Sequence, residues 1–254
     1  MFEVLPQIAL LLILAAFCAG FVDSIAGGGG LITVPALLLA GASPLEALAT
    51  NKLQGTFGSA TAMVTYARAG HVRPLDQLGM AAVSAVAAAV GALVAHLIPA
   101  EVLGLVMPVV LIAVALFFAL RSGLSDQDSI ARMRPAVFTA TAVPLIAAYD
   151  GLFGPGTGSF FMMGFVLLAG YGILKATAHT KMLNFASNFG SLLVFIPTGA
   201  IWWGLGFAMA AAQIAGAGLG ARLASRIGAR LIRPLLVAVS SIMALRLLWQ
   251  ALAD

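Results

Sequence analysis

Residues 21–35 read FVDSIAGGGGLITVP, in which the acidic Asp23 and a run of four glycines at 27–30 interrupt an otherwise apolar sequence. In lipid, an unpaired backbone group costs several kcal/mol, so a glycine run at this depth must be buried in protein or line a cavity. A new helix beginning near Gly29 or Gly30 would point its free N–H groups and the positive end of its dipole at the break. We therefore predict a broken helix whose restart is suited to an anion.

The second half of the chain contains a matching stretch, YDGLFGPGTGS at residues 149–159. Asp150 corresponds to Asp23, and residues 154–158 correspond to residues 27–31, both at an offset of 127 residues. Two broken helices at corresponding positions of two halves are the best indication, at the level of sequence, of a transporter's binding site. The two breaks are therefore the centre of the predicted site.

The composition is that of an integral membrane protein. Apolar residues make up 62% of the chain and charged residues 9%, and the mean hydropathy is +1.08. A soluble domain carries about 25% charged residues, so this chain could not cover a water-facing surface. Long apolar runs, together with 28 glycines that permit close helix packing, predict an all-α bundle rather than a β-barrel.

Nothing in the sequence indicates nucleic-acid binding, a metal site or catalysis. The net charge is +4, but most lysines and arginines lie in a few short loops, where they report membrane topology. The single cysteine, Cys18, excludes an internal disulfide, and we expect it to be a small buried apolar side chain. No two histidines have metal-ligand spacing, and neither a phosphate-binding loop nor a Ser-His-Asp signature is present. We therefore expect no enzyme activity, no cofactor and no metal.

Apolar periodicity and the positions of Gly and Pro predict ten helical segments. They lie at about 5–26, 30–40, 43–68, 75–97, 101–120, 135–152, 158–169, 173–197, 203–224 and 229–251. The chain is accordingly divided into a first membrane repeat at 1–121, a cytoplasmic connection at 122–134 and a second membrane repeat at 135–254.

The repetition extends beyond the order of segments and indicates an internal duplication. Lys52 matches Lys181, and Gly70 matches Gly199, at an offset of 129 residues. The change of offset from 127 places a two-residue insertion in the second half, after its glycine break. The two halves are therefore expected to share one fold.

The distribution of charge predicts that the halves are inverted. If each half crosses the membrane five times, equivalent loops lie on opposite sides and the positive-inside rule requires them to differ in charge. The loop at 68–73 is basic and its counterpart at 199–203 is uncharged. The loop at 97–101 lacks Lys and Arg, whereas its counterpart carries four arginines at 222–233. Both termini are then predicted to be periplasmic.

A competing interpretation treats the short segments at 30–40 and 158–169 as re-entrant hairpins, which gives eight spans and parallel halves. An eleven-residue helix covers only about half of a ~30 Å hydrocarbon core at ~1.5 Å per residue, which favours this alternative. It would, however, place the arginines at 222–233 outside. We therefore favour ten segments, the two short ones being completed by unwound glycine stretches.

Few ionisable residues are predicted to lie inside the membrane, and such residues normally face a cavity or pair with one another. Asp23 and Asp150 are either proton-coupling carboxylates or caps that satisfy N–H groups of the broken helices. Lys52 and Lys181 are either an anion site with two ammonium groups or lysines that extend to the membrane surface. His179 either takes part in the site or completes a hydrogen-bond network.

The predicted substrate-binding residues are those at the two breaks and the polar residues of the helices that follow them. They are Gly28, Gly29, Gly30, Asn51, Lys52, Gly156, Thr157, Gly158, His179, Lys181 and Asn184. The expected partners are a small anionic substrate and the lipid bilayer, and a homo-oligomer is compatible with the sequence.

Several of these motifs resemble a known family. DSIAGGGGLITVP at 23–35, ALATNK at 47–52, GPGTG at 154–158 and KATAHTK at 175–181 are similar to the TauE/SafE sulfite exporter family of anion permeases. The resemblance covers nearly the whole chain. It implies transport of sulfite, sulfoacetate or a related small sulfur-containing anion across a bacterial or archaeal inner membrane.

The resulting hypothesis is a secondary transporter, an exporter by the resemblance, coupled most simply to protons through Asp23 or Asp150. A passive anion channel is the alternative, and an intramembrane enzyme or assembly factor is a third and weaker one. No nucleotide-binding element is recognisable, so an ion gradient would drive transport.

The predicted topology can be tested with reporter fusions. Fusions at Gly70, Ser129 and Gly228 are expected to report the cytoplasm, and fusions at both termini the periplasm, because the arginine-rich loops remain inside. A cytoplasmic C-terminus together with a periplasmic Gly228 would overturn the inverted arrangement in favour of parallel halves.

Overall fold

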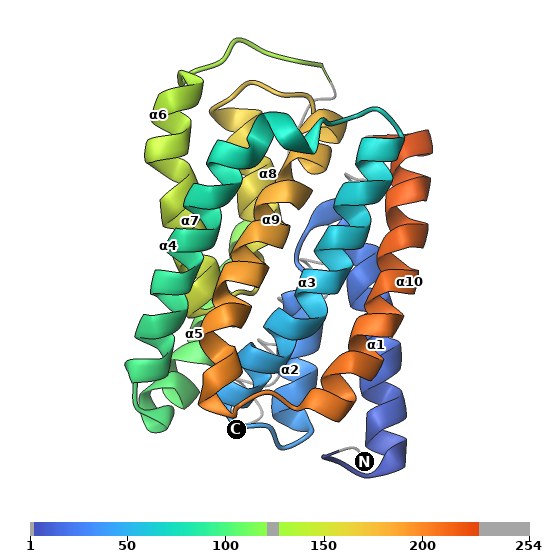
Figure 1. Cartoon of the computed structure of the whole chain (residues 1–254), viewed down its shortest axis with the longest axis vertical. Helices are drawn as coiled ribbons and strands as arrows, with labels where there is room; N and C mark the ends of the chain where they lie inside the picture. Colours follow the sequence, from blue (N-terminus) through green and yellow to red (C-terminus); the bar gives the residue numbers. More distant parts are fainter. Residues whose placement is uncertain (1–2, 121–126, 229–254) are drawn as a thin grey trace.

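The computed structural model describes residues 3–120 and 127–228, and within these ranges the chain forms a bundle of helices without a strand (Figure 1). The all-α prediction is thereby confirmed. The elements are α1 (Pro6–Ala26), α2 (Gly30–Leu39), α3 (Pro44–Arg68), η1 (Pro74–Gln77), α4 (Leu78–Leu97), α5 (Ala100–Leu120), α6 (Pro135–Ala140), α7 (Ala142–Leu152), α8 (Thr157–Leu167), α9 (Ile173–Phe195), η2 (Ile196–Thr198) and α10 (Trp203–Ile227).

Four of the described helical segments are long and apolar enough to cross a membrane. They are Pro6–Ala26, Pro74–Leu97, Pro135–Leu152 and Trp203–Ile227. α2 and α8 are apolar but have only 10 and 11 residues. These short helices follow the glycine breaks, as predicted.

One predicted segment is wrong in detail. The segment at 135–152 is divided at Thr141 into α6 and α7. Pro144 has no N–H to donate to the carbonyl of Ala140, and its ring crowds the preceding turn, so a continuous helix is disfavoured here. The other described boundaries agree with the predicted ones to within a few residues, and the segment predicted at 229–251 lies outside the described residues.

The starts of α3 and α9 are fixed by side chains. At α3, the Ser43 hydroxyl accepts from the Glu46 N–H at 3.3 Å and the Glu46 carboxylate accepts from the Ser43 N–H at 2.7 Å, which is a capping box. At α9, Asp128 accepts from the Gly172 N–H and from Lys175 Nζ, both at 2.7 Å. Both helices that carry predicted site residues therefore begin at a defined position.

The hydrogen bonds from Lys175 and Gly172 lower the pKa of Asp128 below its ordinary value. A carboxyl group whose pKa is lowered by folding stabilises the fold above its ordinary pKa. That contribution is lost as the pH falls through the lowered pKa. The cap of α9 is therefore complete at neutral pH.

One long helix of each half packs against helices of the other half. α10, from the second half, packs along α1 and α3, whereas α4, from the first half, packs along α7 and α9. α3 and α9 contact each other at the centre, and in Figure 1 α3 runs upwards while α9 runs downwards. Equivalent helices thus have equivalent neighbours and opposite courses, which supports the inverted arrangement; the arrangement itself stays a prediction.

Glycines with positive φ recur at matching positions of the two halves. Gly41 and Gly170 have φ values of +96° and +75°, and Gly70 and Gly199 have values of +80° and +71°. Each pair is separated by 129 residues, the offset of the duplication. Because side chains other than that of glycine rarely adopt this conformation, these glycines fix equivalent turns in both halves.

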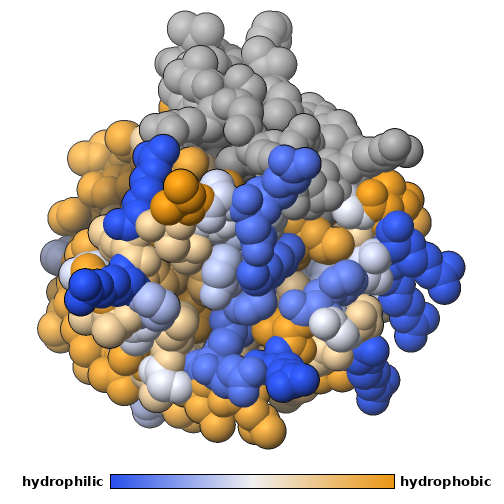
Figure 2. Space-filling model, turned by 90° about the horizontal axis from the view of Figure 1, so that it is seen from above, coloured by the Kyte–Doolittle hydropathy of each residue, from blue (hydrophilic) through white to orange (hydrophobic). Residues whose placement is uncertain are grey.

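Cationic side chains gather at one end of the bundle. The C-terminal ends of α3 and α10, the N-terminal end of α9 and the segment 127–134 meet at the top of Figure 1, and Figure 2 shows hydrophilic residues across that face. These segments and the turn after α3 carry Arg68, Arg73, Arg132, Arg134, Lys175, Arg222 and Arg226. The N-terminal ends of α1, α3 and α5, at the opposite end, carry Glu3, Glu46 and Glu101. By the positive-inside rule this distribution agrees with the predicted orientation, in which the cationic end faces the cytoplasm, and the orientation stays a prediction.

The prediction for Cys18 is wrong. Its side chain is exposed on the bundle surface, because α1 turns a face of small residues, including Ala16 and Gly20, towards its neighbours. A Cβ built on Gly20 would lie 2.6 Å from the carbonyl oxygen of Gln213 in α10. Cys18 lies on a different face of the helix.

Glycines also allow these helices of the two halves to approach closely. A Cβ built on Gly91 of α4 would lie 2.1 Å from the carbonyl oxygen of Ala148 in α7. At the equivalent contact, a Cβ on Gly220 of α10 would lie 2.5 Å from the carbonyl oxygen of Phe21 in α1. No other residue fits at these positions without moving a helix.

We predict that Gly91→Ala lowers the melting temperature of the purified protein in detergent. The added methyl group overlaps the α7 backbone, and overpacking of this kind costs about 1–3 kcal/mol. Gly79→Ala is the matched control, because it lies on the same helix and a Cβ there meets nothing within 4 Å. The control should melt at or above the wild-type temperature, since Ala favours helix over Gly by about 1 kcal/mol. Equal melting temperatures for Gly91→Ala and wild type would contradict the close contact.

Candidate functional site

The two glycine breaks contact each other inside the bundle. The hydroxyl of Ser159, in the first turn of α8, donates to the carbonyl of Ala26 at the end of α1, at 2.8 Å. A Cβ built on Gly27 would lie 2.2 Å from the backbone nitrogen of Ser159, and one built on Gly30 would lie 3.2 Å from the Cα of Pro155. The glycines therefore permit the two breaks to meet backbone to backbone.

A small cavity of about 30 Å³ lies at this contact. A water molecule needs roughly 10–15 Å³ of such space, so the cavity has room for very few waters. Its lining comes from both halves: Asp23, Gly28, Gly29, Gly30, Asn51, Gly55, Asp150, Gly154, Gly156, Thr157, Gly158, Asn184, Asn188 and Gln213. An oxyanion would fit here only if the walls moved apart.

Most of the predicted site residues meet at this cavity. The lining includes both aspartates, the predicted glycines of each break, Thr157, Asn51 and Asn184. Lys52, Lys181 and His179 do not line it. His179 lies against the rings of Tyr171 and Phe165, and its Nδ1 is 2.8 Å from the Lys175 carbonyl, so its geometry is that of a packed histidine in a hydrogen-bond network.

Backbone donors surround the cavity. The N–H of Gly29 is capped by Asp23 Oδ1 at 3.1 Å. The N–H groups of Gly28, Gly30, Gly156 and Gly158 have no acceptor among the described residues. Free N–H groups at the start of a helix are suited to an anion, because the helix dipole adds to their partial charge. α2 and α8 bring two such starts to one cavity.

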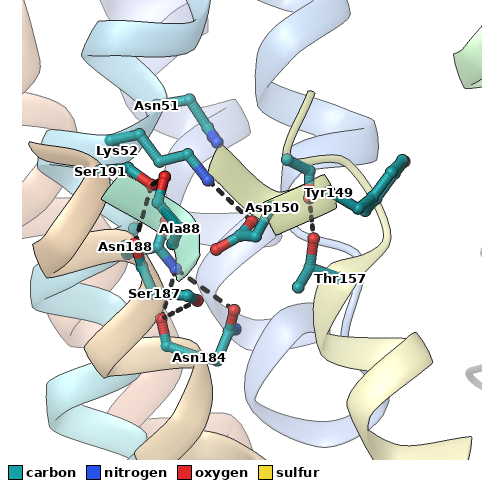
Figure 3. A network of polar contacts seen from close by, with 12 residues as sticks. Asn51, Lys52, Ala88, Tyr149, Asp150, Thr157, Asn184, Ser187, Asn188 and Ser191 are labelled. Atoms are coloured by element: carbon teal, nitrogen blue, oxygen red, sulfur yellow. Dashed lines mark hydrogen bonds and ion pairs between the residues drawn. The ribbon is translucent and has the colours of Figure 1, made fainter. Parts of the chain in front are cut away.

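Amide side chains add further donors. Asn51 Oδ1 accepts from Thr33 Oγ1 at 2.7 Å and from Gln54 Nε2 at 3.5 Å, and its Nδ2 lies towards Gly30. Figure 3 shows Asn188 beside Asn184, to whose carbonyl its Nδ2 donates at 2.7 Å. These neutral groups can bind oxygen atoms without adding charge.

Lys52 is fully buried and pairs with a carboxylate from the other half of the chain. Its Nζ donates to Asp150 Oδ1 at 2.7 Å (Figure 3). The Nζ also lies beside Gly154, since a Cβ built there would be 3.2 Å away from it. The alternative that this lysine extends to the membrane surface is therefore excluded.

Lys181 is the counterpart of Lys52 and forms the reciprocal pair. It is fully buried, and its Nζ donates to the main-chain carbonyl of Asp23 and to Asp23 Oδ2, the latter at 3.3 Å. Each lysine thus pairs with the aspartate of the opposite half. The two ammonium groups do not face one cavity together, and with both carboxylates they form a site of zero formal charge.

The sequence did not indicate every residue of the lining. Gly55 and Gln213 were missed, and Gly154 and Asn188 were not included among the predicted site residues. Asn188 is one turn beyond Asn184, so helical spacing could have added it. Gln213 is a single buried amide in an apolar helix, and that isolation was the available signal. Over the described residues, no group of three or more His, Cys, Asp or Glu side chains could hold a metal ion.

The chain is similar to curated transporters over nearly its whole length. It is 57% identical over 237 residues to the "Probable membrane transporter protein ORF9" of Sinorhizobium sp., covering 93% of this chain and 91% of that protein. It is 43% identical over 251 residues to the "Probable membrane transporter protein YfcA" of Escherichia coli K12, covering 99% and 93%. A "Probable membrane transporter protein" of Haemophilus influenzae is 38% identical over 239 residues, covering 94% of each chain.

No solved structure matches the chain significantly. The family model described as "Sulfite exporter TauE/SafE" matches residues 12–247, which include both glycine breaks and both ion pairs. Together with the apolar helices, these similarities support a multi-pass membrane transporter. The chain belongs to the sulfite exporter TauE/SafE family.

Proposed function

We propose that the protein is a secondary transporter that exports a small sulfur-containing anion, such as sulfite or an organosulfonate, across the inner membrane with proton coupling. The observation that carries this proposal is the cavity at which two helix starts present four N–H groups that have no acceptor in the described part of the chain. The tetrahedral or pyramidal oxygens of a sulfur oxyanion match a cluster of several converging donors. The description of the family favours sulfite and export.

The neutrality of the site is compatible with an anionic substrate. The formal charges of Lys52, Asp150, Lys181 and Asp23 cancel. Attraction must then come from helix dipoles, N–H groups and amides, or from a change in protonation. Protonation of either aspartate would give the site a net positive charge, which connects proton and anion binding.

Alternating access is a natural consequence of this arrangement. The breaks of both halves form one small cavity, and inverted halves can open such a site to either side by rocking against each other. The opposite courses of α3 and α9 support this mechanism. The cationic end in Figure 2 would face the cytoplasm and the N-terminus the periplasm.

Sulfite is expected to raise the melting temperature of the purified protein. A ligand that binds only the folded protein stabilises it by about 2.7 kcal/mol at 100 times its Kd. Sulfate, thiosulfate, sulfoacetate and acetate at the same ionic strength would rank the substrates, and chloride is the control. If no anion of the series shifts the melting temperature beyond the chloride control, the anion site is absent.

The second candidate function is a passive anion channel, and a measurement of sulfite flux can distinguish it from a coupled transporter. The small size of the cavity favours a transporter, because an open channel needs a continuous path. Proteoliposomes with an imposed pH gradient should accumulate sulfite above its external concentration. Equilibration that stops at equal electrochemical potential of the anion, whatever the pH gradient, would identify a channel.

A further inference from the structure

The two ion pairs are related by the duplication, yet their carboxylates are bonded differently. Asp23 is saturated. Its Oδ1 accepts from the Gly29 N–H at 3.1 Å, and its Oδ2 accepts from Lys181 Nζ at 3.3 Å and from Asn184 Nδ2 at 3.4 Å. Lys181 also binds the main-chain carbonyl of Asp23. This pair caps α2 and connects it to α9.

Asp150 has one oxygen without a partner. Its Oδ1 accepts from Lys52, whereas its Oδ2 is buried and makes no hydrogen bond with any described residue. The side chain is only 3% exposed, and Asp150 lines the cavity. A buried acceptor without a donor is unfavourable, and more so if it is charged. Such an atom is suited to receive a proton.

Among the described residues, Lys52 is the one charged side chain that pairs directly with Asp150. The surrounding elements carry these titratable or charged side chains: Cys18 and Asp23 on α1, Glu46, Lys52, Tyr66 and Arg68 on α3, His96 on α4, Tyr149 on α7, and Lys175, His179 and Lys181 on α9. Glu46 and Arg68 lie in the first and last turns of α3, Cys18 is exposed, and the Tyr66 hydroxyl donates to the Ser24 carbonyl at 2.9 Å. Asp23 and Lys181 pair with each other. Lys175 and His179 belong to the first two turns of α9, and His96 lies exposed in the last turn of α4. The Tyr149 hydroxyl donates to the Pro155 carbonyl at 2.7 Å, and α6 and α8 carry no titratable side chain.

We infer that the two pairs have different roles, an inference that rests on the proposed anion transport. The Asp23–Lys181 pair is a permanent structural connection. The Asp150–Lys52 pair opens when a proton from solvent binds Asp150 Oδ2, and the Lys52 ammonium, which keeps its three protons, then pairs with the anion. Proton and anion thus occupy the site together.

The charge balance assigns a substrate class. A net charge inside a low-dielectric bundle is strongly unfavourable. One proton on Asp150 and one singly charged anion beside Lys52 leave the site neutral, as it was when empty. The site should therefore accept singly charged sulfur oxyanions, such as hydrogensulfite and simple sulfonates, in preference to dianions such as sulfate.

The same linkage sets the sign of coupling. Because the proton favours the anion, the anion favours the proton by the same factor, and both cross in the same direction. Export would then run down the anion's own gradient and carry a proton outward, while an inward proton gradient would drive uptake.

The experiment compares wild type, Asp150→Asn and Asp23→Asn by calorimetry of sulfite binding in buffers of different ionisation enthalpy. The two variants change equivalent positions, so each is the control for the other. Wild type and Asp23→Asn should each take up about one more proton per sulfite than Asp150→Asn, because sulfite's own titration is common to all three. As the pH rises, the wild-type Kd should rise by up to about tenfold per pH unit relative to that of Asp150→Asn, because binding of the anion then requires uptake of a proton.

Equal proton uptake by wild type and Asp150→Asn, or a loss confined to Asp23→Asn, would overturn the assignment. If a variant fails to fold, the inference can be tested on the wild type alone, by comparing its infrared spectra with and without sulfite. A protonated carboxylic-acid band that appears when sulfite binds supports the inference, and its absence overturns it. Failure of wild type to bind any sulfur oxyanion would instead refute the proposed function itself.

Discussion

Two buried ammonium groups, the buried carboxylate of Asp150 and the partly buried carboxylate of Asp23 lie in the middle of this membrane bundle, and the rest of the structure depends on their pairing. Moving one such ion from water into a dry interior costs on the order of 20 kcal/mol in the idealised limit, and several kcal/mol after relaxation. No member can therefore be left alone. Lys52 pairs with Asp150 and Lys181 with Asp23, each across the two halves. Neither half neutralises its own charges, so the pairing holds the halves together.

The lysine nitrogens and aspartate oxygens reach each other only because the backbones of the two halves lie close together. Gly27 lies against Ser159 at the breaks, and Gly91 lies against Ala148 between α4 and α7. A β-carbon at either glycine would overlap the neighbouring backbone and force the two segments apart. Other glycines of the two breaks, among them Gly28 and Gly156, have N–H groups without an acceptor among the described residues. The close packing of the two halves and the anion binding that we propose thus depend on the same sequence feature, the glycines of the two breaks.

Sequence reasoning identified the membrane class, the duplication and both breaks, because these depend on composition, periodicity and Gly or Pro at fixed offsets. It placed ten of the thirteen predicted site residues at the cavity that the structure shows. It could not decide which aspartate each lysine pairs with. Because the two halves have nearly the same spacing, each lysine could pair with the aspartate of its own half or with that of the other half. The division at Thr141 and the exposed Cys18 depend on local geometry and on which helix face has a neighbour, and one sequence does not determine either.

The difference between the two aspartates originates in the breaks themselves. Gly29 has a right-handed conformation with a φ of −53°, and its N–H reaches back to cap Asp23. Its counterpart Gly156 follows Pro155 and has a left-handed φ of +83°, so its N–H points elsewhere and Asp150 Oδ2 stays without a donor. A duplicated motif with identical charges has thereby acquired one saturated carboxylate and one unsaturated carboxylate. In a membrane interior, where every unmatched polar atom is expensive, an unpaired carboxylate oxygen of this kind is suited to a ligand that binds it for part of the transport cycle that we propose, and a proton is the smallest such ligand.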